Sequence, residues 1–348
     1  MKIMYFNYIE TNAGWGAECF VDSALKILGH DVVSIDYKKH QYDLCQQIID
    51  IGDFDVVLLQ RGDWFPKEIL RVIDRPIVFW ASELVMRCRD QDRLLYSGLF
   101  TDIFVHSATC EKIVVRKNAK KGIQVDVRYL LNGYDSNLHR KDDKVEKTID
   151  ILFIGSVTRR RQEILEKLKS RGLNITVCEG VYGEEFVSKV NSAKIVINIH
   201  SSSRLDTETR IFEVLGCGGF IVSEPLSEEN PFIPGEHFIE ANVTDFPNVV
   251  NYYLKNEAER VAIASCGHME ALNKHSYLER TRRDIVPILQ SAINKHKDIT
   301  EKPFDKYLLL RYEEKQKSRI RRTIKYIYIK CFEKYQHIWD RLIDLYEK

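Results

Sequence analysis

The sequence has no long apolar run. None of its stretches approaches the ~20 apolar residues that a membrane-spanning helix needs. Met1–Asn7 is too short an apolar run for a signal peptide and is not followed by a cleavage site. We therefore expect a cytoplasmic protein, which would reach the inner face of a membrane only through its surface.

The sequence also lacks an excess of either charge. Its 52 Lys and Arg residues balance 51 Asp and Glu residues, so that the formal net charge is +1. This balance excludes a protein that binds nucleic acid through its overall charge, although a local basic patch can still act.

Sequence motifs for metal or redox chemistry are missing. The eight cysteines form no C-x-x-C pair, which argues against a structural zinc or a redox dithiol. Asp90-x-Asp92 lies in a charged segment rather than at the end of an expected strand, where a diphosphate-bound metal would be held. We expect no metal site and no cofactor.

What is present is an alternation of strands and helices in a chain long enough for two domains. Near-continuous apolar runs, typical of parallel strands covered on both faces, predict strands at 2–7, 31–36, 55–60, 76–81, 102–106 and 125–130. Helices are expected at 17–28, 42–51 and 109–117. The repetition predicts an α/β doubly wound, Rossmann-like sheet.

The same pattern restarts after a charged stretch at 139–148, which is expected to be a linker. Strands follow at 149–155, 174–178, 194–199 and 220–223, and helices at 161–170, 184–191, 207–216, 246–256 and 258–274. We predict two Rossmann-like domains, at 1–140 and 149–290, that face each other across a ligand-binding cleft.

A basic amphipathic extension is expected at 300–348. Between Lys315 and Lys334 there are eight Lys or Arg residues and one acid, and an apolar stripe runs from Ile320 to Leu345 at helical spacing. Three interpretations are open. The helix packs on the body or on another copy in a homo-oligomer, it lies on an anionic membrane surface, or it contacts a polyanion such as nucleic acid.

The segment from Asn198 to Glu224 carries the clearest chemistry. A polar loop at Ser201–Ser203 follows a strand, and the N–H groups of the next helix point toward that loop, which suits a diphosphate. Arg204 and Arg210 add guanidinium donors for phosphate oxygens. Glu213 shares a helix face with Arg210, and its carboxylate can accept hydrogen bonds from both ribose hydroxyls. The alternative is an ordinary surface ion pair.

The R-x-F-E-x-x-x-x-G-G pattern from Arg210 to Gly219 resembles glycosyltransferases of the GT-B fold, specifically the CgeB-like branch of the group-1 family. Further segments match in the same order. They are Ile151–Ser156 with the three arginines at 159–161, Tyr182–Phe186, Pro234–Phe238 and His275–Arg280. The resemblance covers about residues 149–290 well and the N-terminal half only loosely.

This resemblance implies a hexosyltransferase-like enzyme whose co-substrate, a nucleotide-diphosphate sugar, is bound by the C-terminal domain without a metal. Glu213 would hold the ribose and Tyr182 would lie near the base. Leu205 stands where related retaining enzymes often carry a second glutamate, so retention or inversion of configuration stays open. The residues expected on the diphosphate and sugar side are Gly155, Ser156, Arg159, Arg160, Arg161, His200, Ser201, Asp206 and Arg210.

The acceptor is expected at the N-terminal domain. The Gly14-Trp15-Gly16 loop follows the first strand, where a backbone without Cβ atoms lets a ligand approach closely. Asp63, Glu83 and His106 lie near the ends of later strands and are the candidate catalytic residues. One of them would act as the general base of an inverting enzyme or orient the sugar in a retaining one.

Other functions fit parts of the same pattern. Gly14-x-Gly16 with Asp36 imitates the dinucleotide fingerprint of nicotinamide-dependent oxidoreductases, but Cys19 stands in place of the third glycine. A non-catalytic GT-B-like binding protein and a nucleotide-sugar epimerase are further alternatives, because a fold does not define a function.

Overall fold

The computed structural model describes residues 1–14, 16–85, 89–202 and 205–297, together with 309, 327, 329–331 and 335. These residues divide into two compact units. The first holds Met1–Leu131 and the described residues from Thr281 on, and the second holds Asn132–Arg280. Within the described part of the chain, no helix combines the length and the apolar character needed to cross a membrane.

The first unit is built on a six-stranded parallel sheet with the order β2-β1-β3-β4-β5-β6. Its strands are β1 (Lys2–Asn7), β2 (Asp31–Asp36), β3 (Val56–Gln60), β4 (Ile77–Ala81), β5 (Asp102–Val105) and β6 (Asp126–Tyr129). Its helices are α1 (Ala17–Ile27), α2 (Leu44–Ile51), α3 (Lys67–Val72), α4 (Asp92–Leu95), α5 (Ala108–Lys120), the π-helix η2 (Thr281–Ile285) and α12 (Val286–Lys297).

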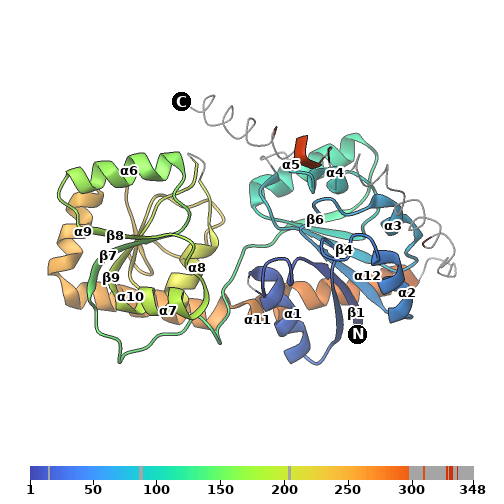
Figure 1. The fold of residues 1–348 in the computed structure, drawn as a ribbon, viewed down its shortest axis with the longest axis horizontal. Coiled ribbons are helices and arrows are strands. Elements are labelled where there is room, and N and C mark those ends of the chain that lie inside the picture. The colour runs from blue at the N-terminus through green and yellow to red at the C-terminus, as the bar shows by residue number, and fades with distance from the viewer. Residues whose placement is uncertain are drawn as a thin grey trace. The chain divides into compact units, whose positions relative to one another are not determined.

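Both faces of this sheet are covered by helices, which explains its continuous apolar strands. Alternate strand residues such as Phe6, Leu59 and Phe79 pack with α2, α3, α4 and α5 in one core. On the other face, α12 lies against β3 and β4. Figure 1 shows α5 and α12 on opposite sides of the sheet.

The second unit has a five-stranded parallel sheet with the order β11-β10-β9-β7-β8. Its strands are β7 (Ile149–Ile154), β8 (Ile175–Cys178), β9 (Ala193–Asn198), β10 (Ile221–Ser223) and β11 (Ile239–Glu240). Its helices are α6 (Arg159–Ser170), α7 (Gly183–Ser192), α8 (Thr209–Gly216), α9 (Phe246–Lys255), α10 (Glu257–Lys274) and α11 (Tyr277–Arg280).

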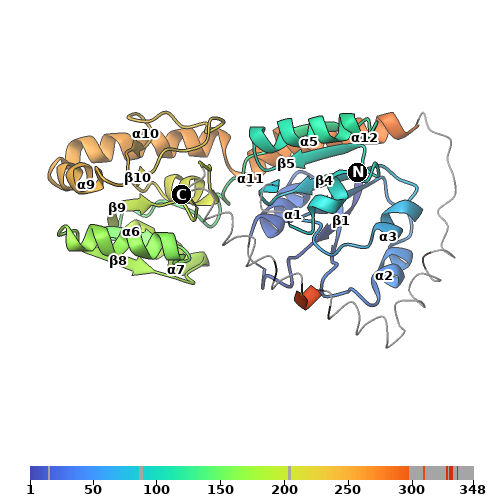
Figure 2. The same ribbon diagram turned by 90° about the horizontal axis from the view of Figure 1, so that it is seen from above.

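The strand pleat divides the apolar residues of this unit between two layers. Phe153, Ile195 and Ile197 share a core with Leu165 of α6 and Val250 of α9. Figure 1 shows α6 and α7 on opposite sides of the sheet, and Figure 2 shows α9 and α10 lying side by side. The carboxyl ends of β7, β9 and β10 therefore lie at one edge, where their connections carry the polar residues.

Two segments differ from the sequence-based expectation. The charged stretch 139–148 lies within the second unit. The side-chain amide of Asn191 joins two of its backbone groups, because it accepts from the Asp142 N–H at 2.8 Å and donates to the Arg140 carbonyl at 3.0 Å. Residues from Thr281 on pack with the first unit rather than with the second.

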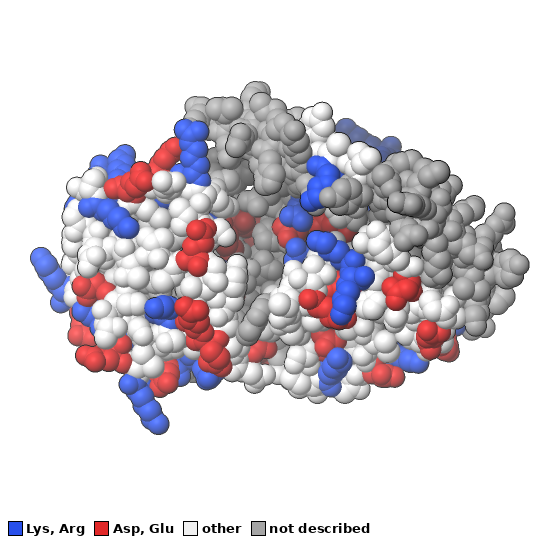
Figure 3. All heavy atoms as spheres, viewed as in Figure 1, with Lys and Arg blue, Asp and Glu red and all other residues white. Residues whose placement is uncertain are grey.

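The basic extension lies mostly outside the described residues, in the part of the chain that Figure 3 draws in grey. Of its apolar stripe, the structure describes Ile327, Cys331 and Tyr335, which are all exposed. Its contact with a membrane, a polyanion or a second copy stays a prediction.

Candidate functional site

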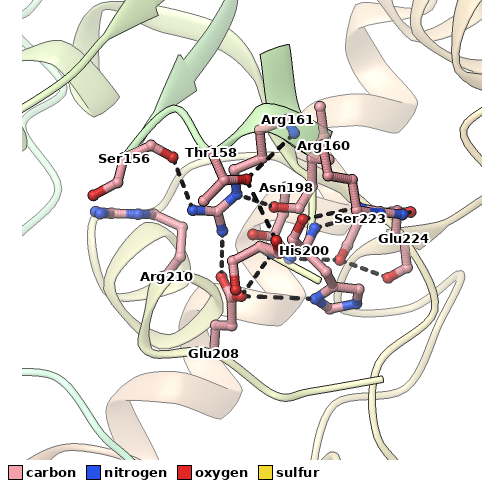
Figure 4. A network of polar contacts seen from close by, with 12 residues as sticks. Ser156, Thr158, Arg160, Arg161, Asn198, His200, Glu208, Arg210, Ser223 and Glu224 are labelled. Atoms are coloured by element: carbon pink, nitrogen blue, oxygen red, sulfur yellow. Dashed lines mark hydrogen bonds and ion pairs between the residues drawn. The ribbon is translucent and has the colours of Figure 1, made fainter. Parts of the chain in front are cut away.

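Three connections of the second unit meet in one polar network at the carboxyl edge of its sheet (Figure 4). The turn after β7 ends at Thr158, whose side-chain oxygen accepts from the Arg161 N–H at 3.4 Å and so caps α6. The Thr158 hydroxyl also donates to the Ser201 carbonyl at 3.3 Å. These bonds tie the turn after β7 to the loop after β9.

Arg161 forms the centre of this network. Its side chain is 10% exposed, and it donates to three oxygens from different segments. The distances are 2.7 Å to the Ile199 carbonyl, 3.1 Å to the Ser156 carbonyl and 2.8 Å to the carboxylate of Glu208. Glu208 in turn accepts from the Ser201 N–H at 3.3 Å. Arg161 therefore fixes the backbone of the loops next to the expected diphosphate position.

Arg160 is held by a carboxylate that the sequence reading did not single out. Its two terminal nitrogens donate to the two oxygens of Glu224, and one also donates to the His200 carbonyl at 2.8 Å. The side chain of Glu224 is 9% exposed, and it also accepts from the His200 N–H at 2.7 Å. This forked geometry adds both strength and geometric specificity to the ion pair.

His200 is buried beneath the same loop. Its Nε2 donates to the Pro225 carbonyl at 2.8 Å, since a carbonyl only accepts, so the proton lies on Nε2. Its Nδ1 finds no hydrogen-bond partner among the described residues and lies 4.0 Å from the carboxylate of Glu208.

Arg210 and Glu213 share one face of α8, as their spacing predicted. Arg210 donates to Glu213 at 2.8 Å, and its guanidinium lies over the ring of Phe186, 4.4 Å from the ring centre. His139 approaches Glu213 with Nε2 at 3.7 Å. Burial holds the pKa of His139 below its usual value, so the ring is neutral at neutral pH. Figure 4 shows Arg210 on the same side of the network as Ser156.

Other residues were also expected at the donor site, and the structure places some of them as follows. The Arg159 side chain is 88% exposed and pairs with Glu163 on the surface of α6. Tyr182 precedes α7 and is 64% exposed, and Asp206 is half-buried. Ser203 and Arg204 lie outside the described residues. Contact of any of these residues with a nucleotide sugar stays a prediction.

Sequence reasoning did not assign Thr158, Glu208 and Glu224 of this network to the site, nor His139 beside Glu213. Thr158 shows the sequence signal of a helix N-cap, a threonine before a helical stretch. Glu208 and Glu224 have no such signal, because their partners lie 47 and 64 residues away along the chain.

The first unit carries a chain of alternating charges at the carboxyl edge of its sheet. Arg61 donates to Glu18 at 2.8 Å and lies 3.3 Å from Glu83, while Arg89 donates to Asp63 at 2.8 Å and lies 3.5 Å from the other oxygen of Glu83. Burial lowers the pKa of Arg61, but Glu18 and Glu83 outweigh this effect and raise it above its usual value. The predicted candidates Asp63 and Glu83 thus belong to one ionic chain.

The remaining acceptor-side candidates are placed separately. His106 is buried directly after β5, with 8% of its surface exposed. Gly14 and Gly16 adopt positive φ angles of 78° and 103°, which glycine tolerates. Trp15 lies outside the described residues.

Asp36 does not present its carboxylate as a dinucleotide site would require. It accepts from the hydroxyl of Thr11 at 3.0 Å and from the N–H groups of Lys38 and Lys39 at 3.1 and 3.0 Å. These bonds commit its oxygens to the loops around it. In the described segments, no three His, Cys, Asp or Glu residues cluster closely enough to hold a metal ion.

Asp92→Asn is expected to stabilise the protein at pH 8 by roughly 1–2 kcal/mol after solvent screening, and to have no effect near pH 4. Burial raises the pKa of Asp92 to about 7, with a further contribution from Asp63. The folded state therefore retains a proton that the unfolded state loses at about pH 4, so stability falls as the pH rises from about 4 to 7. Asparagine carries no charge at any of these pH values, so the variant does not lose stability through ionisation of a buried carboxylate.

Melting temperatures between pH 4 and 8 measure this effect. Asp50→Asn, at an exposed position on α2, is the control and should show no such trend. An Asp92→Asn protein that melts no higher than the parent at pH 8 would contradict the assignment.

Residues 143–284 match a family model described as glycosyl transferase-like. Two uncharacterised proteins of Acanthamoeba polyphaga mimivirus, L140 and L137, are 31% identical over 75 residues and 34% identical over 91 residues. These segments make up 21% and 25% of this chain, and they span only 23% and 12% of the two viral proteins.

Solved structures resemble the chain over most of its length. Sucrose-phosphate synthase from Thermosynechococcus elongatus has a TM-score of 0.61 at 11% identity, covering 84% of this chain and 99% of that protein. Anabaena HepE in complex with UDP has a TM-score of 0.58 at 13% identity, covering 84% and 100%. A glycosyltransferase from Rickettsia africae has a TM-score of 0.56 at 11% identity, covering 84% and 98%. The likeness establishes the GT-B fold, as the sequence predicted.

Proposed function

We propose that this protein is a glycosyltransferase that moves a sugar from a nucleoside diphosphate sugar to an acceptor without a bound metal ion. The observation that carries the proposal is the Arg210–Glu213 pair on α8. It shares an edge of the second unit with the turn after β7, in the segment that matches the glycosyl transferase-like model.

In the proposed reaction, the bond between C1 of the sugar and the diphosphate oxygen breaks, and an acceptor oxygen forms a new bond to C1. The acceptor proton passes to a base or to the leaving diphosphate. Negative charge grows on that diphosphate, so a fixed guanidinium and helix N–H groups bind the transition state more tightly than the ground state. We assign this role to Arg210 and the first turn of α6.

The two carboxylates of the donor side have different tasks in this proposal. Glu213 accepts hydrogen bonds from the ribose hydroxyls. When the ribose binds, these bonds partly replace the hydrogen bond that Glu213 accepts from Arg210. Glu224 stays with Arg160 and holds the loop after β9 in place, because its oxygens already accept from Arg160 and from the His200 N–H. Asp63, Glu83 and His106 stay the candidates for proton transfer or for orienting the sugar.

UDP-sugars are the first donors to test, since the Anabaena protein of similar fold is described with UDP and with UDP and glucose. We expect UDP or another nucleoside diphosphate to raise the melting temperature by mass action, by several degrees at saturating concentrations. The screen compares UDP, GDP, ADP, CMP, TDP, NAD and NADP, each with and without EDTA.

The screen separates the alternatives. Stabilisation by one nucleoside diphosphate, unchanged by EDTA, followed by acceptor-dependent consumption of its sugar conjugate, agrees with the proposal. Consumption of the donor without any acceptor would indicate an epimerase or a hydrolase. Stabilisation by NAD alone would indicate an oxidoreductase, and no response at all would leave a non-catalytic binding protein.

A further inference from the structure

The ionic chain at the edge of the first unit has the composition of a binding site for hydroxyl groups. We propose that the chain Glu18–Arg61–Glu83–Arg89–Asp63 binds an uncharged saccharide and discriminates against phosphorylated or carboxylated ones. The inference rests on the proposed function only in naming this saccharide as the acceptor.

The exposed part of the chain is its middle. The two end carboxylates, Glu18 and Asp63, are 1% and 7% exposed, whereas Arg61, Glu83 and Arg89 are 22%, 26% and 29% exposed. Each guanidinium is bound tightly to its buried carboxylate at 2.8 Å and more loosely to Glu83, at 3.3 and 3.5 Å. Glu83 thus keeps acceptor capacity for a ligand, because a carboxylate offers about four lone pairs.

The exposed groups alternate as guanidinium, carboxylate and guanidinium, and this series of donors and acceptors is complementary to neighbouring sugar hydroxyls. A hydroxyl group donates one hydrogen bond and accepts others, so neighbouring hydroxyls can donate to Glu83 and accept from Arg61 and Arg89. Hydrogen bonds in which one partner is charged are among the stronger ones in proteins.

The net charge of the ionic chain disfavours the binding of anions. Among the described residues, which leave out 86–88, three carboxylates of this ionic chain face two guanidinium groups, and the adjacent pair of Asp90 with Arg93 is balanced. A phosphate would therefore enter a site that already has one surplus negative charge.

The backbone that presents the chain is strained and firmly held. Arg61 and Trp64 have φ angles of 71° and 64°, in the left-handed region that side chains rarely adopt. Gly62 lies between them at φ 82°, where a Cβ would lie 2.7 Å from the ring of Phe79. The Gly62 N–H donates to the hydroxyl of Tyr37 at 2.8 Å. Such strain persists where the surroundings enforce it, and it is concentrated at binding sites.

The test measures saccharide binding to the intact protein without any nucleotide, by saturation-transfer difference NMR titration. The probes are glucose, galactose and N-acetylglucosamine, with glucose 6-phosphate, galactose 6-phosphate and glucuronate as charged counterparts. We expect a neutral sugar to bind at least about tenfold more tightly than its charged counterpart.

Two variants test the role of Glu83. Glu83→Gln removes the surplus charge, so it should weaken binding of the neutral sugar. It should also reduce the ratio of the affinities for the neutral and the phosphorylated sugar by about tenfold. Glu83→Asp keeps the negative charge but shortens the side chain by one methylene group. It should therefore weaken binding of the neutral sugar and leave the ratio of affinities for the neutral and the phosphorylated sugar unchanged. Glu68→Gln, at an exposed position on α3, is the matched control and should change neither quantity.

The proposal is overturned if phosphorylated sugars bind as tightly as neutral ones, if no saccharide binds, or if Glu83→Gln behaves like Glu68→Gln. UDP titrations of the same samples keep the two proposals separate. Sugar binding without nucleotide binding would contradict the proposed function alone, and nucleotide binding without sugar binding would contradict this inference alone.

Discussion

Glu213→Ala should weaken binding of the nucleoside diphosphate roughly 10- to 100-fold and leave the melting temperature of the unliganded protein nearly unchanged. A carboxylate that accepts from ribose hydroxyls contributes about 1.5–3 kcal/mol through charge-assisted hydrogen bonds, which corresponds to that range. Glu213 makes its ion pair within one helix turn, and Arg210 keeps its contact with the ring of Phe186 when the carboxylate is removed, so the loss costs the fold little. Isothermal titration calorimetry measures the affinity directly.

Two further variants give this prediction a control and a coupling test. Arg210→Ala should weaken binding of the nucleoside diphosphate by a similar factor. It should weaken binding of the free nucleoside less, because the Arg210 guanidinium is assigned to the phosphates. Glu184→Ala removes another carboxylate of the same unit, which pairs with Arg140 at the surface and is 67% exposed. It should leave affinity unchanged. Equal affinities for the parent and both site variants would show that α8 carries an ordinary ion pair.

Glu224→Ala should lower the free energy of unfolding by about 3 kcal/mol and the melting temperature by roughly 5–10 °C. The change removes the forked partner of Arg160 and leaves the buried His200 N–H without an acceptor. Removing one partner of a poorly exposed ion pair costs more than the pair itself contributes, because the remaining charge stays desolvated. Differential scanning calorimetry measures both quantities.

Glu228→Ala is the matched control, because it removes an exposed glutamate four positions further along the same loop. It should change the melting temperature by less than about 1–2 °C. Glu224→Gln keeps one acceptor oxygen and should fall between the two. If Glu224→Ala melted like Glu228→Ala, the connection between the β7, β9 and β10 ends would not contribute to stability as the geometry indicates.

Most strands could be predicted because each is a short, nearly continuous apolar run. The observed bounds of β1 and β2, Lys2–Asn7 and Asp31–Asp36, agree with the expected ranges, and the other expected strands differ by one or two residues. The strand β11 (Ile239–Glu240) was not predicted, because two residues are too few to show a period.

The position of α12 shows a different limit. An apolar stripe predicts that a helix is buried, but it does not identify the sheet that covers it. Residues 281–290 were expected in the C-terminal domain, whereas α12 packs on β3 and β4 of the first unit. The choice between two apolar sheet faces depends on shape and on the path of the chain, which no local pattern records.

The candidate site divides along the same line. The spacing of Arg210 and Glu213 predicted a shared helix face, and the structure has their charged groups at 2.8 Å. In contrast, the sequence did not distinguish which of the three adjacent arginines after β7 would face the diphosphate. The structure gives them three different environments, with Arg159 on the surface, Arg160 on Glu224 and Arg161 on Glu208.

The sequence by itself determined the local features of this protein, namely the α/β alternation, the strand positions, the balanced charge and the helix face of Glu213. Each depends on residues within one turn or one strand of each other, so backbone geometry alone connects them. Only the tertiary structure decided which charged groups pair across different helices, strands and loops. Arg160 and Glu224 are 64 residues apart, and Arg61 lies 43 residues from Glu18. Such pairs form because folding removes these groups from water and each charge must find an opposite one.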